Sequence, residues 1–184
     1  MYVAIIVVAV LVLIFMWVAG SYNGFVKVRN RAEEAFSTMD VYLKKRYDLI
    51  PNLVETVKGF AKHEQETLDK VISARARAVN STSPEETLDA ERELGGALGR
   101  LMVLTENYPE LKANTNFMDL QNQLKQMEGE IANSRKYYNA VVKEYNTKIQ
   151  VFPGNLLAGM FGFQKKPLFE VSNEAERENV KVAF

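Results

Sequence analysis

Cysteine is absent from the 184 residues of this chain, and histidine occurs once, as His63. Without cysteine there is no disulfide and no thiol chemistry, and the redox compartment is left undecided. An excess of charge is also missing, because 23 Lys and Arg residues balance 23 Asp and Glu residues. Nucleic-acid binding needs a basic stripe or patch, so no nucleic-acid partner is expected. Together these absences remove most metal sites and most nucleophile–base pairs.

The motifs nearest to catalytic signatures are incomplete. His63-Glu64 has the start of a zinc-binding helix, but position 67, where the second His belongs, is Thr. We therefore predict His63 on a solvated helix surface. The segment 95–99, Gly-Gly-Ala-Leu-Gly, lacks the Lys-Ser/Thr of a phosphate loop. We predict no catalytic, cofactor-binding or metal-binding residue, no cofactor, and no enzymatic activity.

What the chain does have is an apolar run without charge from Met1 to Gly20. As a helix this run is about 30 Å long, which matches the hydrocarbon core of a bilayer. Trp17 and Tyr22 lie where it would meet the headgroups, a position that amphipathic rings prefer. The alternative is a cleaved signal peptide, but no Lys or Arg precedes the run and Val18-Ala19-Gly20 is a weak cleavage site. A transmembrane anchor is favoured, with the lipid bilayer as partner.

The charges that flank the run predict its orientation. Lys27, Arg29 and Arg31 follow it, whereas only the α-amino group precedes it. Positive residues beside a span tend to stay in the cytoplasm. We expect a single-pass membrane protein with a cytoplasmic domain, the alternative being a periplasmic or extracellular domain.

Helical spacing of apolar residues continues through most of the remaining chain. Pro51 is expected to end the first helix and to open a turn in which Asp48 caps the next one. Ser83-Pro84 starts the third helix, and the mid-helix glycines 95, 96 and 99 predict close approach by a neighbouring helix. The predicted helices cover residues 21 to about 47, 51–79, 84–107 and 117–150.

These helices predict an all-α fold: an N-terminal transmembrane helix continuous with an antiparallel, up-down-up-down four-helix bundle. Sustained three-four spacing favours coiled-coil-like packing of the bundle. The predicted domains are an anchor (1–20), the bundle (21–150), an apolar membrane-proximal segment (151–166) and a C-terminal tail (167–184). The tail is charged at residues 172–181, while Leu168, Phe169 and Val171 are candidates for docking.

The segment 151–166 is predicted to lie near the bilayer surface. Four alternating helices return the chain to the membrane, and this segment is rich in apolar side chains and ends on two lysines. The alternative is that it closes the base of the bundle. The predicted membrane-interface residues are Trp17, Tyr22, Leu156, Leu157, Phe161, Phe163, Lys165 and Lys166.

Several longer motifs resemble the LemA family over nearly the whole chain. They are Tyr22-Asn23, Arg29-Asn30, Asp40-Val41, Leu43 to Val54, Val57-Lys58-Gly59, His63-Glu64, Tyr138-Asn139, Tyr145-Asn146, and Phe152-Pro153-Gly154-Asn155 to Phe161-Gly162-Phe163. Tyr42 and Phe36 depart from the residues expected in that family. The resemblance implies a bacterial membrane protein with one N-terminal span and a helical bundle, and it implies no activity. It also suggests a recognition surface at the predicted turn, with Asp48, Ile50, Pro51 and Asn52 as candidates.

The function predicted from these features is a non-enzymatic, membrane-anchored scaffold that forms homo-oligomers. The alternative is an adaptor or sensor that binds another membrane or envelope protein through the bundle. Both functions use surface and geometry, which is what a chain without reactive side-chain constellations has to offer.

Overall fold

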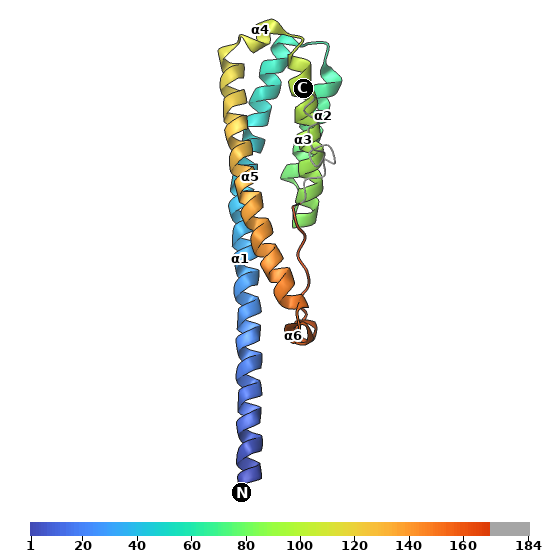
Figure 1. Ribbon diagram of the computed structural model, residues 1–184. Coiled ribbons are helices and arrows are strands. Elements are labelled where there is room, and N and C mark those ends of the chain that lie inside the picture. Colours follow the sequence, from blue (N-terminus) through green and yellow to red (C-terminus); the bar gives the residue numbers. More distant parts are fainter. Residues whose placement is uncertain (170–184) are drawn as a thin grey trace, which may run out of the picture. The chain divides into compact units, whose positions relative to one another are not determined.

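The computed structural model describes residues 1–169, and all regular structure in that range is helical (Figure 1). The all-α prediction is confirmed. The predictions for Val171 and the charged tail lie outside the described residues. The helices are α1 (Tyr2–Phe60), α2 (Gln65–Val79), α3 (Pro84–Thr105), α4 (Pro109–Lys112), α5 (Thr115–Gln150) and α6 (Gly154–Met160).

Helix α1 joins the apolar run to the amphipathic segment without a break over 59 residues. Its most apolar stretch has a mean hydropathy of 3.1, with none of it buried inside the protein. In residues 1–169, α1 is the one helix long and apolar enough to cross a membrane. Beyond that stretch, the predicted helical stripe is confirmed as core, because Phe25, Met39 and Leu43 are at most 2% exposed.

The prediction that Pro51 ends the first helix is wrong. Pro51 has no N–H to give to the carbonyl of Tyr47, which is the usual reason for a break. In the structure, Nε of Arg75 on α2 donates to that carbonyl at 2.7 Å. A side chain from another helix thus supplies the donor that Pro51 lacks, and α1 continues to Phe60.

The break after α1 lies instead at residues 61–64, and α2 begins at Gln65 rather than at Pro51. His63 is exposed in this turn, so its predicted place on a helix surface is also wrong. The turn is short and internally bonded, since the N–H of Glu64 donates to the carbonyl of Ala61 at 3.1 Å.

The predicted start of α3 is confirmed. Ser83 is its N-cap, with Oγ accepting from the N–H of Glu86 at 3.2 Å, and Pro84 occupies the first turn. The glycine prediction is wrong: at Gly95, Gly96 and Gly99 no atom lies within 4 Å of where a Cβ would be. These glycines face open space instead of a neighbouring helix.

Helix α5 closely matches the long helix predicted from spacing. Asn114 caps it, with Oδ1 accepting from the N–H of Phe117 at 3.0 Å. The short α4 was not predicted. Pro109 occupies the first turn of α4, where a missing N–H has no cost.

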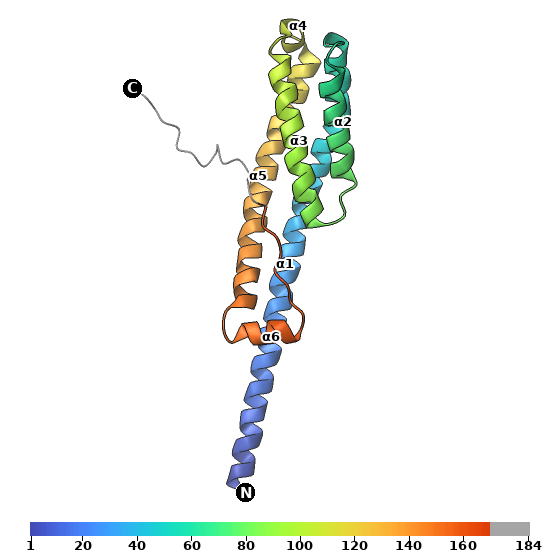
Figure 2. The same ribbon diagram turned by 90° about the vertical axis from the view of Figure 1, so that its right-hand side faces the viewer.

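The described chain divides into two compact units. The first contains Met1–Arg46 and Lys125–Leu168, and the second contains residues 47–124 and Phe169. Within the first unit, α1 and α5 lie side by side in both views (Figures 1 and 2). Phe36 and Tyr138 pack there edge to face at 5.8 Å, and the nearly buried Arg46 pairs with Glu128.

The second unit contains the ends of α1 and α5 together with α2, α3 and α4. Leu53, Val71, Leu94 and Leu101 from α1, α2 and α3 are fully buried in it. A buried polar pair joins α1 to α3, because the hydroxyl of Tyr47 donates to Glu91 at 2.7 Å.

Candidate membrane-interface site

Helix α6 lies crosswise to α1 at the end of α5, within the first unit (Figure 2). Gly154 opens α6 at a point of close approach. A Cβ on Gly154 would lie 3.1 Å from the carbonyl oxygen of Lys148 and 3.2 Å from the ring of Phe25. A larger residue at this position would require Lys148 or Phe25 to move by a few tenths of an ångström.

Helix α6 ends in a Schellman motif. Gly162 has a φ of 71°, which L side chains rarely adopt. The N–H of Phe163 donates to the carbonyl of Ala158 at 2.9 Å, and the N–H of Gly162 donates to the carbonyl of Gly159 at 3.4 Å. This turn sends Phe163 back toward α1.

An aromatic cluster joins the C-terminal end of α6 to α1. The ring of Tyr22 packs edge to face on Phe161 at 5.0 Å and on Phe163 at 5.7 Å. Phe163 also packs on Phe25 at 5.3 Å and lies under the guanidinium of Arg29. The cluster fixes α6 at the level of residue 22 of α1.

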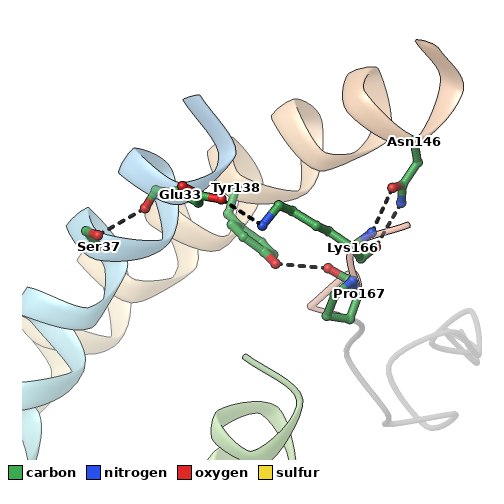
Figure 3. A network of polar contacts seen from close by, with 6 residues as sticks. All are labelled: Glu33, Ser37, Tyr138, Asn146, Lys166 and Pro167. Carbon is green, nitrogen blue, oxygen red and sulfur yellow. Dashed lines mark hydrogen bonds and ion pairs between the residues drawn. The ribbon is translucent and has the colours of Figure 1, made fainter. Parts of the chain in front are cut away.

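Residues 163–168, which we call the strap, are held against α1 and α5 by polar contacts (Figure 3). The side chain of Asn146 binds the backbone of Lys166 twice, donating to its carbonyl at 2.8 Å and accepting from its N–H at 2.9 Å. The hydroxyl of Tyr138 donates to the carbonyl of Pro167 at 3.0 Å, and the ammonium of Lys166 lies 3.3 Å from Glu33. The strap therefore holds α6 from its C-terminal side.

The outer side of this site is apolar and exposed. We call its five large side chains the apolar rim. Leu156 and Met160 are four residues apart on α6 and so share a face, and the others flank the helix. Their exposed fractions are 51% for Val151, 79% for Phe152, 59% for Leu156, 77% for Met160 and 47% for Phe161.

The structure brings three of the eight predicted membrane-interface residues into contact. Tyr22, Phe161 and Phe163 form one cluster, Leu156 and Lys165 are exposed, and Trp17 lies on α1 with 43% of its surface exposed. Leu157 is only 6% exposed, so its side chain belongs to the interior of the unit. The side chain of Lys166 is engaged by Glu33.

Sequence reasoning missed three parts of the site. Phe152 and Met160 are the two most exposed residues of the rim, and the four-residue step from Leu156 to Met160 was the signal for the latter. The role of Asn146 had no signal, because a helical Asn does not show which backbone it will bind.

The candidate recognition residues do not form a turn, because all four lie inside α1. Asp48, Pro51 and Asn52 are exposed, with the three-four spacing of one helix face. Ile50 is fully buried and is unavailable to a partner.

A groove of about 630 Å³ lies between α2 and α3. Its charged lining is largely paired: Glu66 with Lys70 at 2.5 Å, and Glu93 with Arg77 at 2.5 Å. These carboxylates are exposed, and Lys70 lowers the pKa of Glu66. A carboxyl group with a lowered pKa, such as that of Glu66, is unsuited to general acid catalysis, which needs a raised pKa.

Reactive side chains do not converge at the membrane-interface site. Across residues 1–169, no three residues among His, Cys, Asp and Glu are grouped so as to hold a metal. Burial raises the pKa of Tyr145 on α5, Arg29 opposes this and Glu33 adds to it, so the phenol stays neutral at physiological pH. What the site offers is an apolar surface held firmly beside the apolar end of α1.

Comparison with known proteins places these features in context. The LemA family model matches residues 35–184. Protein LemA of Metamycoplasma hominis is 27% identical over 165 residues, covering 88% of this chain and 74% of that protein. Magnetosome protein MamQ 2 of Paramagnetospirillum magneticum is 26% identical over 175 residues, and MamQ of Magnetospirillum gryphiswaldense is 26% identical over 174. The chain covers 64% of the length of each MamQ protein.

Proposed function

Because the chain belongs to the LemA family, we propose that it is a membrane-anchored helical scaffold that acts without catalysis and assembles with further copies of itself. The observation that carries this proposal is the continuity of α1. One helix of 59 residues includes both the apolar stretch and a stripe of the folded core. Such a helix sets the height of the first unit above a bilayer, which is the task of a scaffold.

The framework of the scaffold is proposed to be an antiparallel four-helix bundle. Three helices of the second unit contribute fully buried leucine or valine side chains, and α5 adds Phe117, which is 1% exposed. Short connections between α1, α2 and α3 favour antiparallel neighbours.

Self-association is proposed to use exposed apolar side chains of the second unit. Val103 on α3 is 72% exposed, and Ile72 and Val79 on α2 are 48% and 50% exposed. The open glycines of α3 would let a partner helix approach its backbone closely.

Cross-linking in native membranes tests the assembly. An amine-reactive cross-linker should give a ladder of multiples of the chain, and two differently tagged copies should purify together after co-expression. Copies expressed separately and mixed after solubilisation are the control. A single heterologous band, with no self-multiples, would contradict the scaffold and support the adaptor or sensor. The exposed face of Asp48, Pro51 and Asn52 is then the surface to substitute first.

The anchor is proposed to cross the bacterial inner membrane once, with both units in the cytoplasm. Lys27, Arg29 and Arg31 support this orientation. Because the chain has no cysteine, Lys62→Cys in the exposed turn after α1 gives one labelling site. A membrane-impermeant maleimide should label this cysteine only after the cells are lysed. Asn107→Cys provides a second exposed labelling position, for which the same result is expected. Labelling of both in intact cells would place the domain in the envelope.

A further inference from the structure

We infer that the apolar rim of α6 is a second lipid-contacting element, which lies in the headgroup layer and inserts its side chains toward the acyl chains. The inference rests on the proposed anchoring of α1 and is independent of self-assembly. The occupant is the bilayer itself rather than another protein.

The level of α6 along α1 is the first argument. A bilayer has a core about 30 Å thick and is about 40–45 Å thick with headgroups, which leaves roughly 5–8 Å of headgroup on each side. Each helical residue rises about 1.5 Å, so Tyr22 lies only about 3 Å beyond Gly20, where the apolar run ends. The ring of Phe161 is 5.0 Å from that of Tyr22. The C-terminal end of α6 is thus at headgroup level when α1 spans the membrane.

The direction of α6 is the second argument. Helix α6 is crosswise to α1 and is seen nearly end-on in Figure 1 and lengthwise in Figure 2. A helix crosswise to a spanning helix lies along the membrane surface, as amphipathic interfacial helices do. Leu156 and Met160 share one face of it, and neither is covered by the protein.

The composition of residues 151–164 indicates which kind of lipid they would contact. Residues 151–164 contain no Lys, Arg, Asp or Glu. Of the two lysines that follow, Lys166 is engaged by Glu33. Contact with lipid is therefore driven by burial of apolar surface, and a neutral bilayer suffices for it.

Single cysteines in the full-length chain test the inference. An environment-sensitive fluorophore is attached at Met160→Cys or Phe152→Cys, and the protein is reconstituted in phosphatidylcholine vesicles. Val41→Cys, 54% exposed on α1 and outside the proposed self-association surface, is the control, and Phe15→Cys reports on the anchor. Lipids with nitroxides at known depths quench from the bilayer, and iodide quenches from water.

The expected result is quenching of the Met160 and Phe152 labels by shallow nitroxides, a blue shift, and loss of iodide quenching. The Val41 label should stay open to iodide, and the Phe15 label should be quenched by deep nitroxides. Adding phosphatidylglycerol should leave these values unchanged.

Each other outcome has a distinct meaning. A Phe15 label outside the lipid overturns the anchoring, whereas a lipid-quenched Phe15 label with an iodide-accessible Met160 label overturns only the inference. A Met160 label shielded from both quenchers would assign the rim to a second copy or another protein. Lipid quenching that requires phosphatidylglycerol would refute contact by apolar burial.

Discussion

At the scale of single residues, glycine is favoured where two segments meet with little room for a side chain. Gly154 is such a residue, because the carbonyl of Lys148 and the ring of Phe25 occupy the space around it. Gly159 in the same helix has no atom within 4 Å of its missing Cβ, so it is free of that constraint. Alanine variants of Gly154 and Gly159 therefore distinguish the effect of close packing from the general effect of glycine on helix stability.

Gly154→Ala should therefore destabilise the protein, whereas Gly159→Ala should not. Overpacking costs about 1–3 kcal/mol where the neighbours cannot move, and one of the neighbours here is backbone. Thermal unfolding in detergent micelles, followed by circular dichroism, should show a lower Tm for Gly154→Ala. An equal Tm for the two variants would show that α5 and α6 adjust freely at their junction.

At the scale of elements, α1 passes through Pro51 because α2 supplies a donor. Arg75→Ala should cost about 1–3 kcal/mol, the usual penalty when a backbone acceptor loses its partner. Pro51→Ala restores an N–H to the helix, so Arg75→Ala should cost less in that background. Chemical unfolding of the two single variants and the double variant should give a coupling of about 0.5–3 kcal/mol. Strict additivity would mean that the contact with Arg75 does not compensate for the proline.

The N-terminus of α3 gives a pH-dependent prediction. The backbone and side chain of Thr82 donate to the carboxylate of Glu86 and, with the backbone of Ser83, lower its pKa from the ordinary value of 4.5. A lowered folded-state pKa means that this stabilisation is complete above about pH 4.5 and is lost as pH falls through the lower value.

Hydrogen exchange measured at a series of pH values checks this locally. After correction for the intrinsic rate, exchange of the Thr87 amide should accelerate at acid pH in the unmodified protein. Glu86→Gln should abolish the dependence, and Glu85→Gln on the same exposed turn is the control. A pH dependence that persists in Glu86→Gln would assign the effect to another group.

These elements show which parts of the fold could be predicted from sequence. Caps such as Ser83 and Asn114 act on residues three positions away, so local sequence contains the needed information. The path through Pro51 depends on Arg75, a residue 24 positions later whose direction no local pattern records. The glycines of α3 were misread because a small residue is compatible with a close neighbour and with open space.

In the candidate site, too, some features could be predicted from the local sequence and others depend on distant residues. Apolar composition and proximity to the span predicted a membrane-interface role for residues 151–166, and two of the candidates chosen there, Leu156 and Phe161, are exposed. Composition could not separate Leu156 from the buried Leu157, because the direction of α6 is set by Gly154, Gly162 and the aromatic cluster. The strap depends on Asn146 and Tyr138, which bind backbone groups about 20 and 29 residues away.

At the scale of the whole molecule, orientation is proposed to follow from few charges, so it should be open to change. Adding Tyr2→Lys and Val3→Lys and replacing Lys27 and Arg31 by Gln reverses the flanking bias. Arg31 pairs with Glu144 at a site where both side chains are nearly half exposed, so its loss should cost about 0–1 kcal/mol.

Lys62→Cys reports the outcome in intact cells. The parent should be shielded from an impermeant maleimide, and the four-residue variant should become labelled in part or in full. A variant in which Lys27 and Arg31 are exchanged for Arg and Lys keeps the charge and serves as the control. No change in labelling would show that these flanking charges do not set the orientation.

The unbroken course of α1 has one more consequence, which concerns rotation. In a helix, each residue adds about 1.5 Å of rise and about 100° of turn, so height and azimuth change together. One residue inserted before Gly20 would move Tyr22 and the aromatic cluster away from the bilayer centre along the helix axis. It would also rotate them about that axis. Since no break separates Tyr2 from Phe60, nothing along α1 absorbs that turn. The length of the apolar stretch therefore fixes both how far the first unit stands from the bilayer and which way it faces.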